Sequence, residues 1–88
     1  MTKNYGVIPN YILMDNSITP SARVLYMAIT SITDEKGCCS VTNSHIGKLL
    51  GINLQTVSNL IQVLKKKNYI RVDYINNQRF IYALGGAE

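Results

Sequence analysis

The sequence predicts an α+β domain in which a three-helix core is followed by a C-terminal β-hairpin. Three observations support this prediction. Side chains that cap helices precede three segments of helical apolar spacing, a glycine separates the last two, and two strand-like segments end the chain. The 88 residues, 47% of them hydrophobic, suffice for one domain with a small core. We expect an arm over residues 1–18, the domain over 19–84 and a tail over 85–88.

The N-terminal part of the chain should form the arm and one long helix. The apolar residues of Ile8–Met14 are consecutive, which indicates an extended arm or a short helical turn that packs on the domain. Thr19 is a favoured N-cap and Pro20 a favoured first helical residue, so we expect a helix over Pro20–Thr33. Its apolar stripe comprises Ala22, Leu25, Tyr26, Ile29 and Ile32. Residues 34–37 suggest a turn and residues 38–41 a short strand.

Two further helices follow, separated by a glycine. Thr42 can cap the first of them, and Gly51 ends it in the manner of a left-handed C-terminal residue. Asn53 can cap the second, which we expect over Leu54–Lys66. The first helix carries Ile46, Leu49 and Leu50, and the second carries Val57, Leu60, Ile61 and Leu64 at spacings i, i+3, i+4 and i+7.

The last part of the domain reads as a β-hairpin. Residues 69–75 and 79–84 are rich in β-branched and aromatic residues, and residues 76–78 form the turn between them. Alternation along the two strands points one set of side chains inward and leaves Arg71 and Arg79 outward. The expected inward set is Ile70, Val72, Tyr74, Phe80 and Tyr82.

The order helix, short strand, helix, helix, hairpin is that of a winged helix-turn-helix domain. Gly47 is small where the two motif helices approach each other, and Gly51 suits a turn with positive φ. We expect Gly51 in a short turn between two helices, with Ile52 buried beneath it. The pattern rests on seven positions in register: Ile46, Gly47, Leu50, Gly51, Ile52, Val57 and Leu60.

The chain resembles the winged helix-turn-helix domains of phage and plasmid replication initiation proteins of Gram-positive bacteria, and more distantly the N-terminal domain of the primosome protein DnaD. The resemblance implies DNA binding in replication initiation or transcription regulation. The chain departs from the common pattern in having Asn68 where glycine often ends the recognition helix, and no arginine on that helix's outer face. The segments that carry the resemblance are Ile8–Leu13, Thr19–Tyr26, Gly47–Ile52, Thr56–Ser58 and Leu64–Ile70.

We expect double-stranded DNA as the partner, bound by the outer face of the Leu54–Lys66 helix. Asn and Gln can pair with adenine through two hydrogen bonds, and Thr can also contact the thymine methyl group. The first residues of the preceding helix can hold a phosphate, and outward lysine and arginine side chains add contacts to the backbone. A wing tip built around Asn76 and Asn77 can reach the minor groove or the backbone. The candidate DNA-binding residues are Thr42, Asn43, Ser44, Lys48, Gln55, Thr56, Ser58, Asn59, Gln62, Arg71, Asn76, Asn77 and Arg79.

Composition narrows the remaining function classes. A formal charge of +4 is compatible with a polyanionic partner without proving one. No apolar run approaches the ~20 residues of a membrane span and no signal peptide opens the chain, so we expect a cytoplasmic protein. Cys38 and Cys39 are adjacent, which excludes a disulfide framework and a paired Cys-x-x-Cys zinc site. We expect both to be buried or half-buried thiols in a reducing compartment.

No arrangement of side chains indicates an enzyme. The acidic residues are scattered, and His45 has no ligating residue at metal spacing, so we expect no catalytic site, cofactor, metal or small-molecule substrate. Lys65–Lys67 can offset the dipole at the helix C-terminus or contact phosphate. Tyr26, Tyr74 and Tyr82 are expected in the core. The role of the other three tyrosines, Tyr5, Tyr11 and Tyr69, remains open between base stacking and packing of the arm, and packing is the default.

A protein–protein module is the alternative function. Winged helices also serve as oligomerisation modules in primosome assemblies. The Ile8–Met14 arm and the tail after Leu84 would then form the interface with a second copy or with a replication protein.

Overall fold

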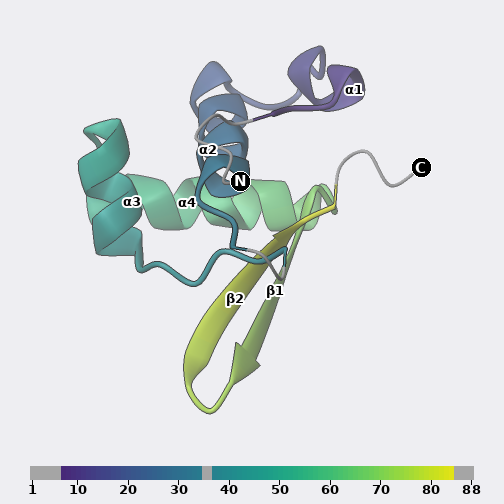
Figure 1. The fold of residues 1–88 in the computed structure, drawn as a ribbon. Helices are drawn as coiled ribbons and strands as arrows, with labels where there is room; N and C mark the ends of the chain where they lie inside the picture. The colour runs from purple at the N-terminus through teal and green to yellow at the C-terminus, as the bar shows by residue number, and fades with distance from the viewer. Residues whose placement is uncertain (1–6, 35–36, 85–88) are drawn as a thin grey trace.

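The structure confirms an α+β winged helix-turn-helix architecture. It is a computed structural model that describes residues 7–34 and 37–84. Helices α2, α3 and α4 form the three-helix core, α1 is a single turn before them, and the hairpin extends away from the helices (Figure 1). The elements are α1 (Asn10–Leu13), α2 (Pro20–Ser31), α3 (Asn43–Leu50), α4 (Leu54–Lys66), β1 (Ile70–Ile75) and β2 (Gln78–Ala83).

All three predicted N-caps of the long helices are formed. The side-chain oxygen of Thr19 accepts a hydrogen bond from the Ala22 N–H at 3.2 Å. Thr42 caps α3 in the same way, and Asn53 caps α4 with a 2.8 Å bond from Thr56. These bonds satisfy N–H groups that the first helical turn leaves without a partner, so the start of each helix follows from local sequence.

Helix α2 is shorter than predicted. It ends at Ser31 rather than Thr33, because Ile32 leaves the helical conformation at φ −110° and ψ 17°. The Thr33 hydroxyl donates to the Ile29 carbonyl at 2.7 Å and satisfies one of the last carbonyls. Ile32 and Thr33 are both β-branched, which disfavours further helix. Ile32 still packs against the core as a half-buried residue.

The core lies between the three long helices and the base of the hairpin. Tyr26 on α2 is buried as predicted, and α2 and α4 contribute several residues each, whereas α3 contributes Ile46 and the half-buried Leu50 and leaves Leu49 exposed. The arm and the hairpin close this core from two sides. Its largest fully buried members are Tyr26, Ile12, Leu25, Ile29, Ile46, Leu64, Ile70, Ile81, Val57 and Cys39.

The N-terminal arm forms a helical turn that packs on the domain. Of the two conformations that the sequence left open, the structure shows the helical turn α1. Ile12 is fully buried, while Tyr11 and Met14 on the same turn are exposed. Before α1, the backbone of Val7 exchanges hydrogen bonds with the Thr30 hydroxyl on α2 at 2.9 and 3.1 Å. Tyr5 lies outside the described residues.

The turn between α3 and α4 has the predicted glycine geometry. Gly51 adopts φ 72°, in the left-handed region, and the Ile52 N–H donates to the Gly47 carbonyl at 3.0 Å. A Cβ atom on Gly47 would lie only 2.7 Å from the Ile52 carbonyl oxygen, so only glycine fits there. The prediction of a buried Ile52 is too strong: the side chain is half-buried at the core edge because the tight turn is itself at the surface.

Asn68 replaces the common glycine without disrupting the helix end. It adopts φ 62°, a left-handed conformation that asparagine tolerates better than most residues. The N–H groups of Asn68 and Tyr69 donate to the carbonyls of Lys65 and Leu64, both at 3.0 Å. This pair of bonds is a Schellman motif, which satisfies the last carbonyls of α4 and directs the chain into β1.

The hairpin turn is one residue shorter than predicted, which changes the face of β2. Asn76 and Asn77 form a two-residue turn with φ values of 52° and 68°, the type I′ geometry that matches strand twist. Gln78 therefore belongs to β2 and pairs with Ile75. A three-residue turn over 76–78 would have placed Phe80 and Tyr82 on the same face as Val72. The two-residue turn instead places Arg79 and Ile81 on the face of Val72.

The predicted faces of the hairpin strands are consequently wrong in part. The inner face carries Ile81 and Arg79 opposite Val72 and Tyr74, whereas Phe80 and Tyr82 lie half-buried on the outer face. Tyr74 is on the inner face but not in the core: it is 69% exposed because the distal part of the wing extends beyond the helices.

The expected strand over residues 38–41 is also reduced. Cys39 makes an isolated antiparallel bridge to Ile81, with hydrogen bonds of 2.8 and 2.9 Å, and no strand extends from it among the described residues. The chain must leave β2 at this point to reach the cap of α3, so only one residue pairs.

Candidate nucleic-acid interface

The outer face of α4 presents three exposed amide side chains. Gln55, Asn59 and Gln62 point away from the buried stripe of the helix, while Thr56 and Ser58 are half-buried at its flanks. The Gln55 side-chain amide donates to the Asn59 side-chain oxygen at 3.0 Å. The two residues are one helical turn apart, so this bond links them in the free protein.

Two exposed leucines on the helix-turn-helix unit were not among the predicted site residues, and only Leu54 lies beside one of these amides. Leu54, the first residue of α4, is 57% exposed and Leu49 at the end of α3 is 54% exposed. Leu54 borders an open groove of about 800 Å³ between the two helices. Neither exposure has a clear signal in the sequence, because Leu49 lies three residues after Ile46 and Leu54 three residues before Val57, so both fit the apolar spacing of their helices. The groove is lined by Ser44, Gly47, Lys48, Gly51, Ile52, Asn53, Leu54 and Gln55.

The start of α3 is joined to the wing by Arg79. Its guanidinium donates to the Asn43 side-chain oxygen at 2.6 Å and to the Val41 carbonyl at 2.9 Å. The predicted outward orientation of Arg79 is therefore wrong, because the two-residue turn puts it on the inner face. The side-chain oxygens of Thr42 and Asn43 both accept protein hydrogen bonds, and Ser44 is exposed beside them.

A small cleft lies between α4 and the inner face of the wing. Its volume is about 110 Å³, and Arg79 and Lys65 bring positive charge to it. No acidic residue lines it. Such a cleft between helix and wing suits an anionic group. The complete lining is Asn43, Ser58, Ile61, Gln62, Lys65, Val72, Tyr74 and Arg79.

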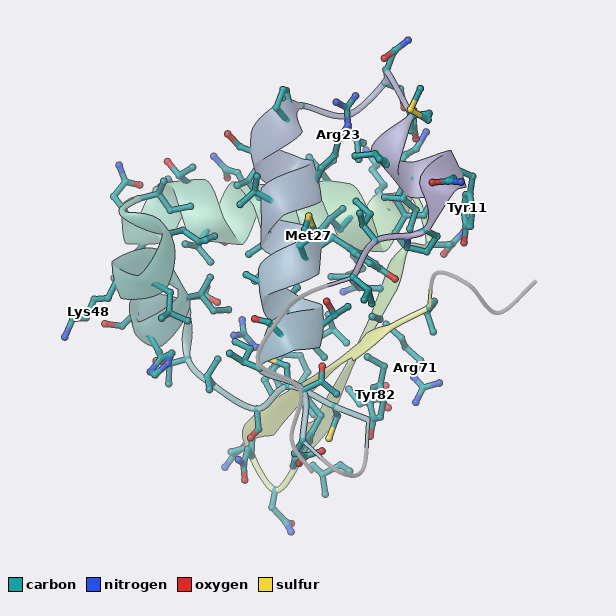
Figure 2. All side chains as sticks on the ribbon, turned by 45° about the horizontal axis from the view of Figure 1, so that its top comes forward. Tyr11, Arg23, Met27, Lys48, Arg71 and Tyr82 are labelled. Atoms are coloured by element: carbon teal, nitrogen blue, oxygen red, sulfur yellow. The ribbon has the colours of Figure 1, made fainter. Side chains whose placement is uncertain are left out.

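Arg71 lies on the opposite face of the wing. Its outward orientation agrees with the prediction, and its guanidinium lies 4.3 Å from the ring centre of Tyr82 (Figure 2). It also contacts the Asp73 carboxylate at 3.3 Å. Arg71 and Arg79 are thus on different faces of the hairpin, and only Arg79 is next to α4. At the tip, Asn76 and Asn77 are exposed as expected.

The segment from α3 through α4 carries positive charge only. Residues 42–67 contain Lys48, Lys65, Lys66 and Lys67 and no Asp or Glu. Lys48 is exposed and extends from the outer side of α3 (Figure 2). Lys67 differs from the others because its ammonium group lies 3.4 Å from the Asp15 carboxylate. Lys48, Lys65 and Lys66 therefore provide the cations of this surface that no described acid neutralises.

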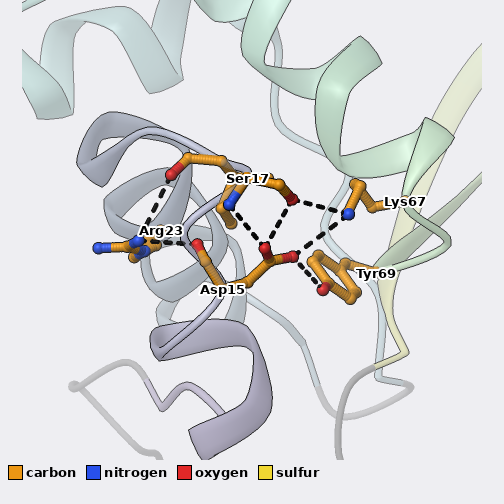
Figure 3. A network of polar contacts seen from close by, with 6 residues as sticks. Asp15, Ser17, Arg23, Lys67 and Tyr69 are labelled. Carbon is orange, nitrogen blue, oxygen red and sulfur yellow. Dashed lines mark hydrogen bonds and ion pairs between the residues drawn. The ribbon is translucent and has the colours of Figure 1, made fainter.

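Asp15 organises a polar network at the other end of α4 (Figure 3). It accepts hydrogen bonds from the Ser17 backbone at 2.8 Å, the Ser17 hydroxyl at 2.6 Å and the Tyr69 hydroxyl. Arg23 donates to the Asp15 backbone carbonyl at 2.7 Å. The network ties the arm to α2 and to the end of α4, so Lys67 and Tyr69 have a structural role there.

These contacts shift the pKa values of Asp15 and Tyr69. The Ser17 and Tyr69 hydroxyls and the Ser17 N–H hold the pKa of Asp15 well below its ordinary value, and the charge of Lys67 acts in the same direction. The hydrogen bond to Asp15, with burial, raises the pKa of Tyr69 to about 12.

The described residues show no candidate metal site. They contain no group of three His, Cys, Asp or Glu side chains that could hold a metal ion. Cys38 and Cys39 are buried free thiols, as predicted, and burial raises the pKa of Cys39. His45 is exposed, and its backbone N–H donates to the Thr42 cap. Across residues 7–34 and 37–84, no helix combines the length and apolar character of a membrane span.

Comparison with known proteins identifies the family. The family described as "Helix-turn-helix domain" matches residues 16–70, more than half of the chain, from just before α2 to the start of β1. Neither the curated proteins nor the solved structures include a match to the chain. The matched region contains α3, the Gly51 turn and α4. The chain belongs to the helix-turn-helix domain family, and this membership supports DNA as its partner.

Proposed function

We propose that the protein binds double-stranded DNA sequence-specifically, with α4 in the major groove and the wing on the neighbouring backbone or minor groove. The observation that carries this proposal is the outer face of α4, which is exposed, rich in amides and free of acidic residues. In helix-turn-helix complexes the N-terminal residues of the second helix contact base edges. The α3 start, Lys48 and the Arg79–Lys65 cleft then lie where backbone phosphates are expected.

Selection of bound sequences from random duplexes tests this proposal. We expect one sequence motif to be enriched, and its affinity to fall steeply between about 50 and 200 mM salt, because each neutralised phosphate adds about 0.9 to the salt slope. Asn59→Ala should weaken binding to the selected motif. Asn10→Ala is its matched control and should not, since Asn10 is an exposed amide on α1, away from α4. Binding without enrichment, or without salt dependence, would contradict the proposal.

We further propose that this binding serves replication initiation or transcription regulation, in the cytoplasm and without catalysis or a cofactor. The resemblance of the sequence to phage and plasmid replication domains supports replication, while a helix-turn-helix domain suits both roles. The two unpaired thiols support a reducing compartment. The selected motif distinguishes the two roles, since it would occur at a replication origin in one case and at promoters in the other.

A protein–protein function is the second candidate, and one observation favours it. Val24 and Met27 on α2 and Tyr11, Leu13 and Met14 near α1 are exposed apolar side chains. Figure 2 shows the positions of Tyr11 and Met27. A second copy or a replication protein would cover them. Sedimentation equilibrium of Val24→Lys against the unchanged chain tests this: a dimer that dissociates in the variant supports it, and a monomer in both excludes the homodimer.

A further inference from the structure

Leu54 is an apolar residue that lies outside the hydrophobic core. It is the first residue of α4 and more than half exposed, next to the exposed amide of Gln55. A single exposed leucine is ordinary on a protein surface. Here the side chain sits at the end of the helix that enters the major groove in this geometry. The thymine methyl group is the apolar feature of that groove, so a leucine at this position has a specific partner there.

The linked amides of Gln55 and Asn59 complement adenine. Their mutual hydrogen bond uses one N–H of Gln55 and the side-chain oxygen of Asn59. The oxygen of Gln55 and the side-chain N–H groups of Asn59 remain available as an acceptor and as donors. Adenine offers the matching N6 donor and N7 acceptor in the major groove. The bond also holds the two amides in place before DNA arrives, which reduces the entropy cost of binding.

The same part of α4 lacks the usual partner of guanine. Arginine and lysine make the commonest specific contact to guanine, through its O6 and N7 acceptors. Residues 54–64 contain neither arginine nor lysine. Lys65 lies about 16 Å along the helix axis from Leu54. Lys48 belongs to α3, the helix that crosses the backbone in this docking geometry.

We propose that α4 selects A·T base pairs, with Leu54 against thymine methyl groups and the Gln55–Asn59 pair on adenine. This inference rests on the proposed DNA binding and specifies its substrate: a duplex whose major-groove contacts are rich in A·T pairs.

Binding to four duplexes of about two helical turns, about 21 bp, tests the inference. One contains A·T pairs only, in mixed order, and the second contains G·C pairs only. The third replaces every thymine of the first by uracil, which removes only the methyl group. The fourth replaces every guanine of the second by inosine, which removes the minor-groove amino group and leaves the major-groove acceptors of guanine.

We expect the A·T duplex to bind at least about fivefold tighter than the G·C duplex, and the inosine duplex to behave like G·C. Uracil should weaken binding by about three- to fourfold for each thymine methyl group that the protein covers. Leu54→Ala should reduce the difference between thymine and uracil, whereas Leu49→Ala, which truncates an equally exposed leucine, should leave it unchanged. Thermal unfolding of both variants verifies that they are folded.

Three outcomes would overturn the inference. Equal affinity for the A·T and G·C duplexes leaves DNA binding intact but removes the base preference. An inosine duplex that binds like A·T assigns the preference to the minor groove, and so to the wing rather than α4. Failure to bind any duplex refutes the proposed function together with the inference.

Discussion

At the scale of single residues, Gln55 and Asn59 act as a pair rather than as two independent readers. Each is exposed, and the hydrogen bond between them means that removal of one releases the other. A bidentate pairing with a base is worth about 1–3 kcal/mol of discrimination. The effects of the two substitutions should therefore not add.

We expect Gln55→Ala and Asn59→Ala each to weaken binding to the selected motif by about 1–3 kcal/mol, and to weaken binding to random duplex much less. The double variant should be weakened by less than the sum of the two. Titration of each variant with both duplexes gives these numbers. Equal effects on motif and random DNA would show that neither amide contacts bases.

Gly47 is the residue on which the approach of α3 to the turn depends. A Cβ atom would meet the backbone oxygen of Ile52, which cannot rotate away as a side chain would. We expect Gly47→Ala to destabilise the fold by about 1–3 kcal/mol, as overpacking does elsewhere. Urea unfolding measures this change, with Gly51→Asn as the control because Gly51 has open space and asparagine tolerates its positive φ. If Gly47→Ala were no less stable than that control, the close approach would be absent.

At the scale of elements, the wing is held to the helix-turn-helix unit by Arg79. Its two hydrogen bonds reach the chain before α3 and the first residue of α3 from the turn end of the hairpin. Arg71, by contrast, extends from the outer face and is bound only locally, to Asp73 and against Tyr82. The two arginines therefore form a matched pair with different expected effects.

We expect Arg79→Ala to lower the free energy of unfolding by about 1–3 kcal/mol, because the substitution removes two charge-assisted bonds from a half-buried site. Arg71→Ala should change it by no more than about 0.5 kcal/mol, as is usual at exposed positions. Denaturant unfolding compares the two. Equal stability changes would refute the bracing role of Arg79.

The salt dependence of DNA binding by Arg79→Ala reports a separate contact. A slope shallower by about 0.9 would show that Arg79 also neutralises a phosphate in the cleft with Lys65. An unchanged slope would leave it as a positioning residue for the wing.

At the scale of the whole molecule, the Asp15 network joins the two ends of the domain. Asp15 belongs to the arm, and Lys67 and Tyr69 belong to the junction of α4 and β1. Ile12 and Ile18 are buried on either side of Asp15, so the arm is an integral part of the core. The ring of Tyr11 also meets that of Tyr69 edge-on, with centres 5.8 Å apart.

The two shifted pKa values predict how stability depends on pH. The pKa of Asp15 is lowered by folding, so its contribution is complete above about pH 4 and disappears as the pH falls further. The pKa of Tyr69 is raised to about 12, so its contribution is complete below about pH 10 and disappears as the pH rises toward that value. Stability should thus fall at both extremes.

We expect Asp15→Asn to be less stable than the unchanged chain at neutral pH and to depend less on pH in both windows, because Tyr69 then lacks its charged partner. Urea midpoints measured across pH test this. Asp73→Asn is the control, since it removes the exposed ion pair with Arg71, which is worth at most about 1 kcal/mol. An unaltered pH profile in Asp15→Asn would mean that the network does not form.

The order of elements, the three caps and the positions of the helix-turn-helix glycines follow from the sequence alone. These features depend on interactions within a few residues: a Thr or Asn oxygen three positions before its N–H donor, or a glycine at a positive φ. The family match over residues 16–70 agrees with that reading. The same local rules explain why Asn68 can replace glycine, although its Schellman bonds became visible only in the structure.

Which side chains the wing turns toward α4 depends instead on tertiary packing. The composition of Asn76–Gln78 allows a turn of two or three residues, and this single difference exchanges the two faces of β2. Packing of Ile81 into the core selects the shorter turn, and Arg79 then reaches Asn43 instead of solvent. The Asp15–Tyr69 bond likewise joins residues 54 positions apart, which no local pattern records.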